Sequence, residues 1–169
     1  MKIAIVYDSV TGNTKMLADA IYEKCEKVDA CVYKEYNDEI LRADLIFVGS
    51  WTDKGSPSDK MKLVYEKIKN KKIFVFGTCG FGGSDEYYRR LFDNTLKYID
   101  SSNTVVDYYF CPGKLPVFIK NKYEKMLEEN PNDKRILNMI DNYNNVLDRP
   151  NFNDLEKLKE KVGKVVNEG

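Results

Sequence analysis

The sequence predicts a doubly wound α/β fold in which helices cover both faces of a five-stranded parallel sheet. Short apolar runs recur along the first 110 residues, separated by segments of helical periodicity. The runs are continuous rather than alternating, which is the pattern of strands buried on both faces. Strand, helix and strand at this rhythm indicate right-handed crossovers.

Five strands are expected, and polar or glycine-rich loops follow the first, third and fourth of them. Ligands of open α/β sheets bind beyond the carboxyl ends of the strands, beside the point where the strand order reverses, so this placement favours the order 2-1-3-4-5. The second run has the weakest strand pattern and is expected at an edge. The strands are residues 3–7, 30–33, 45–49, 73–77 and 105–110.

Helical periodicity places helices between these strands, at about residues 16–28, 61–68 and 88–96, and then three more in a helical tail after Cys111. A five-stranded doubly wound fold needs only one helix there, so the tail is longer than the fold requires. Asn153 and Glu156 have the spacing of a capping box. We expect a single domain over 1–169, with the sheet and its ligand loops in 1–111 and a helical extension in 112–169. The expected tail helices are residues 117–128, 133–147 and 153–166.

The composition is that of a globular protein, with 43% hydrophobic and 32% charged residues. The 27 basic residues balance the 27 acidic residues, which argues against binding to nucleic acid or to an anionic membrane. No apolar stretch approaches membrane-spanning length, and the first residues lack the layout of a signal peptide. A cytoplasmic location is therefore expected.

The chain has no histidine, which excludes serine–histidine and cysteine–histidine nucleophilic catalysis. Cys25, Cys31, Cys79 and Cys111 are scattered and form no CxxC pair, so reduced core thiols are expected rather than disulfides or a metal site. No catalytic side chain is predicted. Any redox chemistry would be carried by a cofactor.

The first loop, DSVTGNT (8–14), joins the first strand directly to a helix. Five of the six positions from Ser9 to Thr14 are Ser, Thr, Asn or Gly, and the helix that starts near Asn13 adds free N–H groups and the positive end of its dipole. None of these donors is cationic, so the loop suits a phosphate monoester held by neutral hydrogen bonds. The alternative is a polar helix cap.

The second loop, GSWTDKGSPS (49–58), contains the single tryptophan of the chain, Trp51. An indole on a loop rich in Gly, Ser and Pro is expected to stack on a flat ligand. The alternative is an indole that folds back over the edge of the sheet. Gly55 would permit a backbone rearrangement here.

The third loop, GTCGFGGSDEYY (77–88), has four glycines within seven residues. Such a loop suits close approach of the backbone to a ligand, or else forms a flexible turn. Phe81, Tyr87 or Tyr88 would supply a second stacking ring, although a core role for the tyrosines is equally consistent with the pattern. Cys79 is expected to be a packed thiol, because no cysteine, histidine or arginine lies beside it in the sequence to activate it.

The segment from Ser9 to Thr14 is similar to the flavodoxin phosphate-loop pattern, Ser/Thr-x-Thr-Gly-Asn-Thr, and stands at the expected place after the first strand. The resemblance covers about residues 1–111 and implies a flavodoxin-like fold that binds FMN. It implies that the first loop holds the phosphate, that the second flanks the isoalloxazine with Trp51 stacked on it, and that main-chain N–H groups of the third line the pyrimidine side. The cofactor-binding residues so predicted are Ser9, Val10, Thr11, Gly12, Asn13, Thr14, Ser50, Trp51, Thr52, Asp53, Lys54, Gly55, Thr78, Cys79, Gly80, Phe81, Gly82 and Gly83.

The pieces WTDKG, GTCGFGGSDEYY, CPGKLP and YEKMLEENP also resemble a subgroup of flavodoxin-like proteins from anaerobic bacteria. This subgroup includes the flavodoxin-like protein that accompanies bacterial bilirubin reductase, and it covers the tail as well. Flavodoxins are usually strongly acidic, which steers them to basic partners. The neutral charge of this chain departs from that pattern.

These features favour an electron-transfer protein that shuttles electrons between redox partner proteins, an unidentified reductase and an unidentified acceptor. One alternative is an FMN-dependent reductase that acts directly on a quinone, a tetrapyrrole or another small acceptor. Another is a non-redox module that binds phosphate or a nucleotide. The segment CPGKLPVF (111–118) leaves the last strand at the same edge and is expected to border the flavin or a partner, unless it is only a linker.

Overall fold

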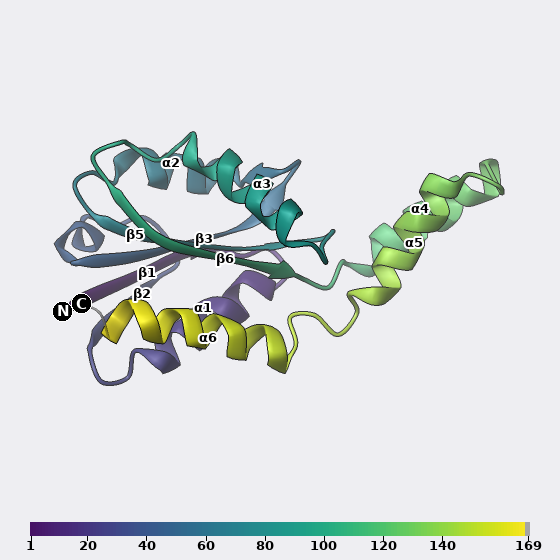
Figure 1. The fold of residues 1–169 in the computed structure, drawn as a ribbon. Helices are drawn as coiled ribbons and strands as arrows, with labels where there is room; N and C mark the ends of the chain where they lie inside the picture. The colour runs from purple at the N-terminus through teal and green to yellow at the C-terminus, as the bar shows by residue number, and fades with distance from the viewer. Residues whose placement is uncertain (168–169) are drawn as a thin grey trace.

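The computed structural model describes residues 1–167 and has a central parallel sheet of strand order β2-β1-β3-β5-β6 (Figure 1). A short strand, β4, pairs antiparallel with β3. The strands are β1 (Lys2–Asp8), β2 (Asp29–Tyr33), β3 (Leu45–Asp53), β4 (Ser56–Pro57), β5 (Lys72–Cys79) and β6 (Thr104–Pro112). The helices are α1 (Asn13–Lys24), the 3-10 helix η1 (Asp38–Arg42), α2 (Asp59–Lys67), α3 (Asp85–Leu96), α4 (Val117–Glu129), α5 (Lys134–Asn145) and α6 (Phe152–Asn167).

Helices cover both faces of the sheet, with α1 and α6 side by side on one face and α2 and α3 on the other (Figure 1). Alternate residues of each strand enter the two cores. Ile5 and Phe47 pack under α1 and α6, whereas Val6 and Val48 pack under α2 and α3. Burial on both faces explains why the strands read as continuous apolar runs.

The predicted fold class and strand order are confirmed, since the order 2-1-3-4-5 corresponds to β2-β1-β3-β5-β6. The sequence patterns missed η1 and β4. The hairpin from β3 to β4 turns at Lys54 and Gly55, which have φ angles of 49° and 79°. Two consecutive positive φ angles are typical of the tight turns that join antiparallel strands.

The three tail helices were predicted correctly, and they have two different roles. Helix α6 returns to the sheet, where Leu158 and Val162 enter the core beside α1, so α6 is the helix that completes the fold. Helices α4 and α5 form a hairpin that projects beyond the carboxyl end of β6 (Figure 1). Tyr123, Ile136 and Tyr143 are buried in this hairpin.

A partly buried ion pair holds the base of the hairpin against α6. The Arg149 guanidinium donates to both oxygens of Asp154, from Nε at 2.6 Å and from Nη2 at 2.5 Å. The predicted capping box at Asn153 and Glu156 is wrong by two residues. The reciprocal bonds join Asn151 and Asp154, because α6 begins earlier, and Asp154 thereby serves both the cap and the ion pair.

The cysteines are free thiols, and three of the four are buried as predicted. The expectation of a core position is wrong for Cys31, which is exposed because β2 is an edge strand of the sheet. Burial raises the pKa of the Cys25 thiol to about 11 and that of the Cys79 thiol to about 12. Burial also raises the pKa of Cys111.

Within residues 1–167, no helix is both long enough and apolar enough to cross a membrane.

Replacement of Asp154 with alanine should destabilise the protein by about 2–4 kcal/mol, because it leaves the Arg149 guanidinium unpaired at a partly buried site and removes the acceptor of the Asn151 N–H in the capping box. Urea unfolding of the whole chain measures this change. Lys164→Ala is the matched control, since Lys164 and Glu160 form an exposed pair worth less than about 1 kcal/mol. Equal free energies of unfolding for the two variants would contradict the structural role of Asp154.

One thiol, Cys31, should react rapidly with a disulfide reagent such as DTNB at pH 8 in the folded protein. The three buried thiols keep their protons at that pH because their pKa values are raised, and only the thiolate attacks. Cys31→Ser should therefore abolish the rapid phase, and denaturant should restore reaction at the other three. A rapid thiol in the folded Cys31→Ser variant would show that one of Cys25, Cys79 and Cys111 is not buried.

Candidate functional site

The three predicted loops meet in one cavity of about 250 Å³ at the carboxyl ends of β1, β3 and β5. These strands are neighbours in the sheet although their loops lie far apart in the chain. A fourth segment, after β6, closes the cavity. Its lining residues are Ser9, Val10, Thr11, Asn13, Thr14, Trp51, Thr52, Thr78, Cys79, Gly80, Gly113, Lys114, Leu115, Pro116, Phe118 and Ile119.

The first loop turns from β1 into α1 around the hydroxyl of Ser9. Ser9 Oγ accepts hydrogen bonds from the main-chain N–H of Gly12 at 3.1 Å and of Lys15 at 3.3 Å. Gly12 has a φ of 93°, a left-handed conformation that glycine adopts without strain, and it precedes the first residue of α1. Ser9 therefore acts as an acceptor inside the loop, and its own hydroxyl proton is left to donate.

The start of α1 has main-chain N–H groups that are open to a ligand. Gly12 provides no side-chain cap for the helix. Within residues 1–167, the main-chain N–H groups of Asn13 and Thr14 have no hydrogen-bond acceptor. Open N–H groups at the positive end of a helix dipole are a ready site for a phosphate, so this donor set fits the phosphate group of FMN.

A line of threonine hydroxyls joins the three loops. Thr14 Oγ1 and Thr78 Oγ1 lie 2.9 Å apart, and both residues are buried. Thr52 Oγ1 donates to the carbonyl oxygen of Thr78 at 2.8 Å. The first loop is thus fixed to the third, and the third to the second, without any charged group.

Trp51 lies at the edge of the cavity with its indole N–H donating to Asp8 Oδ2 at 2.9 Å. This bond holds the indole at the end of β1, which agrees with the alternative of an indole that folds back over the sheet edge; stacking of the indole on a flat ligand stays a prediction. The ring borders the cavity and is also held against the sheet edge. Asp8 lies 3.9 Å from the ammonium of Lys60 as well.

The glycines of the third loop are explained largely by the protein's own packing. A Cβ on Gly80 would lie 2.6 Å from the Leu115 side chain, and one on Gly82 would lie 2.7 Å from Pro112. The loop is therefore in close contact with the segment that follows β6. Gly80 nevertheless lines the cavity, and its carbonyl oxygen accepts a bond from Asn142 Nδ2 of α5 at 2.6 Å.

The segment from Gly113 to Ile119 forms the fourth wall, as expected for the sequence CPGKLPVF. Gly113 N–H donates to the carbonyl oxygen of Cys79 at 2.9 Å. Asn13 Nδ2 donates to the carbonyl oxygen of Lys114 at 2.9 Å and to Thr11 Oγ1 at 3.2 Å. The side-chain amide of Asn13, predicted as a phosphate donor, is thus bonded to protein atoms here.

The other predicted cofactor residues lie outside the lining of this cavity. Ser50 is buried, and its hydroxyl donates to the carbonyl oxygen of Trp51. Gly12 faces a neighbouring hollow beside Lys15 and Lys60. Lys54 and Phe81 are exposed to solvent. The full set outside the lining is Gly12, Ser50, Asp53, Lys54, Gly55, Phe81, Gly82 and Gly83.

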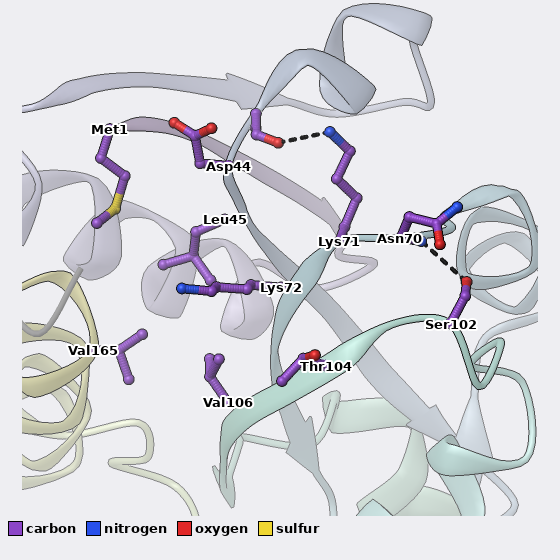
Figure 2. Close-up of a pocket in the computed structure, with 11 residues that line it drawn as sticks. Met1, Asp44, Leu45, Asn70, Lys71, Lys72, Ser102, Thr104, Val106 and Val165 are labelled. Carbon is purple, nitrogen blue, oxygen red and sulfur yellow. Dashed lines mark hydrogen bonds between the residues drawn. The ribbon is translucent and has the colours of Figure 1, made fainter.

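A larger hollow, of about 870 Å³, lies at the opposite edge of the sheet, among the amino ends of the strands (Figure 2). Some of its polar groups are paired with one another. Lys71 Nζ donates to the carbonyl oxygen of Ala43 at 3.1 Å, and Asn70 N–H donates to Ser102 Oγ at 3.0 Å. Volume alone does not identify a ligand site, and the open main-chain N–H groups of α1 lie at the carboxyl ends of the strands.

Comparison with known proteins identifies the fold and the family. A protein-family model described as "Flavodoxin domain" matches residues 4–163. The chain is 30% identical over 159 residues to the flavodoxin-like domain-containing protein BilS of Clostridioides difficile (strain CD3), and 31% identical over 172 residues to BilS of Clostridium symbiosum (strain WAL-14163). Each alignment covers 92% of this chain and 90% of the relative.

Among solved structures, the chain is similar to the flavodoxin of Streptococcus pneumoniae TIGR4, with a TM-score of 0.62 and 19% identity. That alignment covers 100% of both chains, and at this level of identity it supports the fold. The family match confirms the predicted cofactor as well as the predicted fold, and FMN is the cofactor of this type of redox domain. The chain belongs to the flavodoxin domain family.

Proposed function

We propose that FMN binds non-covalently in the cavity at the carboxyl ends of β1, β3 and β5, and that the protein carries electrons between a reductase and an acceptor protein. The observation that carries this proposal is the convergence of the three loops on one cavity, with open N–H donors at one end and an indole at its edge. The free cysteines fit a protein of the reducing cytoplasm.

The first loop would hold the phosphate. Ser9 and Thr11 have hydroxyl protons to donate, and Asn13 and Thr14 have open main-chain N–H groups. Asn13 would contribute through its main chain, because its side-chain amide is bonded to Lys114 and Thr11. The buried hydroxyls of Thr14 and Thr78 would fix the loop in this position.

The isoalloxazine would lie between Trp51 and the main chain of Thr78 to Gly80. The bond from Trp51 Nε1 to Asp8 sets the orientation of the indole before the ring arrives. The other predicted residues of the second and third loops would support the residues that contact the ring; they are Ser50, Asp53, Lys54, Gly55, Phe81, Gly82 and Gly83. FMN, when bound, supplies the redox chemistry; the side chains bind it, orient it and exclude water.

Exchange of electrons with other proteins requires a cofactor near the surface. Two apolar side chains that line the cavity are also largely exposed, Val10 at 71% and Phe118 at 67%. Apolar groups at the mouth of a redox site suit contact with a partner protein. This surface favours a carrier over an enzyme that encloses a small substrate.

The purified protein should bind one equivalent of FMN, giving a yellow solution that bleaches on reduction. Trp51→Ala should weaken FMN binding about 10- to 100-fold, the usual loss for one stacked aromatic ring, and raise the fluorescence of the bound flavin. Fluorescence titration measures both quantities. Tyr22→Ala, which removes a half-exposed ring of α1, is the control. Equal FMN affinities for the two variants would show that Trp51 does not contribute to FMN binding.

The FMN-loaded protein should show no steady turnover of NADH or NADPH with a quinone as the only acceptor. It should exchange electrons once a flavodoxin reductase is added, because a carrier needs a protein donor. Absorbance of the flavin and of the nicotinamide, followed together, distinguishes the two cases. Sustained nicotinamide oxidation without a reductase would instead identify the protein as an enzyme that acts on small acceptors.

A further inference from the structure

We propose that Lys114 pairs with the phosphate of bound FMN, so that the base of the α4–α5 hairpin supplies the cation that the phosphate loop lacks. This inference rests on the proposed function of the cavity as the FMN site. It assigns a binding role to a segment that follows the last strand of the sheet, about 100 residues from the phosphate loop in the sequence.

Lys114 is the one charged side chain among the described residues that line the cavity. Its side chain is exposed, and it forms no ion pair with another of residues 1–167. The remaining lining residues are neutral. A lysine without an ion-pair partner, in the lining of a cavity that also has open N–H donors, is complementary to a phosphate dianion.

The main chain of Lys114 is fixed on both sides. Its N–H donates to the carbonyl oxygen of Arg149 at 2.8 Å, and its carbonyl oxygen accepts from Asn13 Nδ2 at 2.9 Å. Asn13 is the first residue of α1 and carries one of the open N–H groups. The bond therefore ties the backbone of Lys114 to the end of the cavity where the phosphate donors lie.

Two further features keep this arrangement in place. The bidentate ion pair with Asp154 immobilises Arg149, and Asp154 is only 4% exposed. Gly113 lets the chain pass close to the phosphate loop, because a Cβ there would lie 2.5 Å from Asn13 Nδ2. With its backbone held, Lys114 needs only its flexible four-carbon stem to bring the ammonium to the ligand.

Titration of FMN and of riboflavin, which lacks the phosphate, into the apoprotein tests the proposal. Lys114→Gln should weaken FMN binding about tenfold, the usual loss for one hydrogen bond to a charged group, and leave riboflavin affinity unchanged. Lys114→Arg should retain most of the FMN affinity. Lys122→Gln, which neutralises an exposed lysine of α4 outside the cavity lining, should bind both flavins like the parent protein.

Salt provides an independent readout, since the FMN affinity of the parent protein should fall more steeply with ionic strength than that of Lys114→Gln. Urea unfolding of the apo forms verifies that the substitution leaves the fold intact. Equal FMN affinities for the parent and Lys114→Gln would overturn the proposal, and so would an equal loss for FMN and riboflavin. If the parent protein binds neither FMN nor riboflavin, the proposed function itself is overturned.

Discussion

The pairing of β1 with β2 on one side and β3 on the other determines where every part of the site lies. At this point the strand order reverses, so successive connections leave the sheet toward opposite faces and open a crevice beyond the strand ends. The parallel register places Asp8 beside Ser50, and Trp51 beside Thr78. The loops after β1, β3 and β5 consequently meet with no need for long excursions of the chain.

Neutral hydrogen bonds join the three loops of the site. Thr14, Thr78 and Thr52 connect the loops through hydroxyl and carbonyl groups, and every buried side-chain nitrogen and oxygen of residues 1–167 has a partner. A neutral network avoids the cost of burying unpaired charge. It keeps the loops in position while main-chain N–H groups at the start of α1 stay open for an anion.

The sequence was sufficient to predict the sheet, its strand order and the meeting of the three loops, because each rests on a local pattern. The strands appear as continuous apolar runs, and the first loop has a run of Ser, Thr, Gly and Asn residues directly after the first strand. The family match supports FMN, and the roles of individual residues in binding it stay predictions.

Other features depend on residues far away in the chain and leave no local signal. Gly80 resembles a ligand-binding glycine, but its missing side chain makes room for Leu115. Asn13 resembles a phosphate donor, but its side-chain amide bonds the carbonyl oxygen of Lys114, 101 residues further along. The misplaced cap of α6 has a local cause instead, since Asn151 and Asp154 have the same spacing as Asn153 and Glu156.

The α4–α5 hairpin is joined to the cofactor loops by side-chain amides at two points, from Asn13 to Lys114 and from Asn142 to Gly80. If FMN binds at these loops as proposed, a molecule that binds the hairpin and strengthens or breaks these bonds would change the free energy of FMN binding. Thermodynamic reciprocity then requires FMN to change the affinity of that molecule by the same factor. A single coupling free energy would thus link the occupancy of the cofactor site to the occupancy of the hairpin.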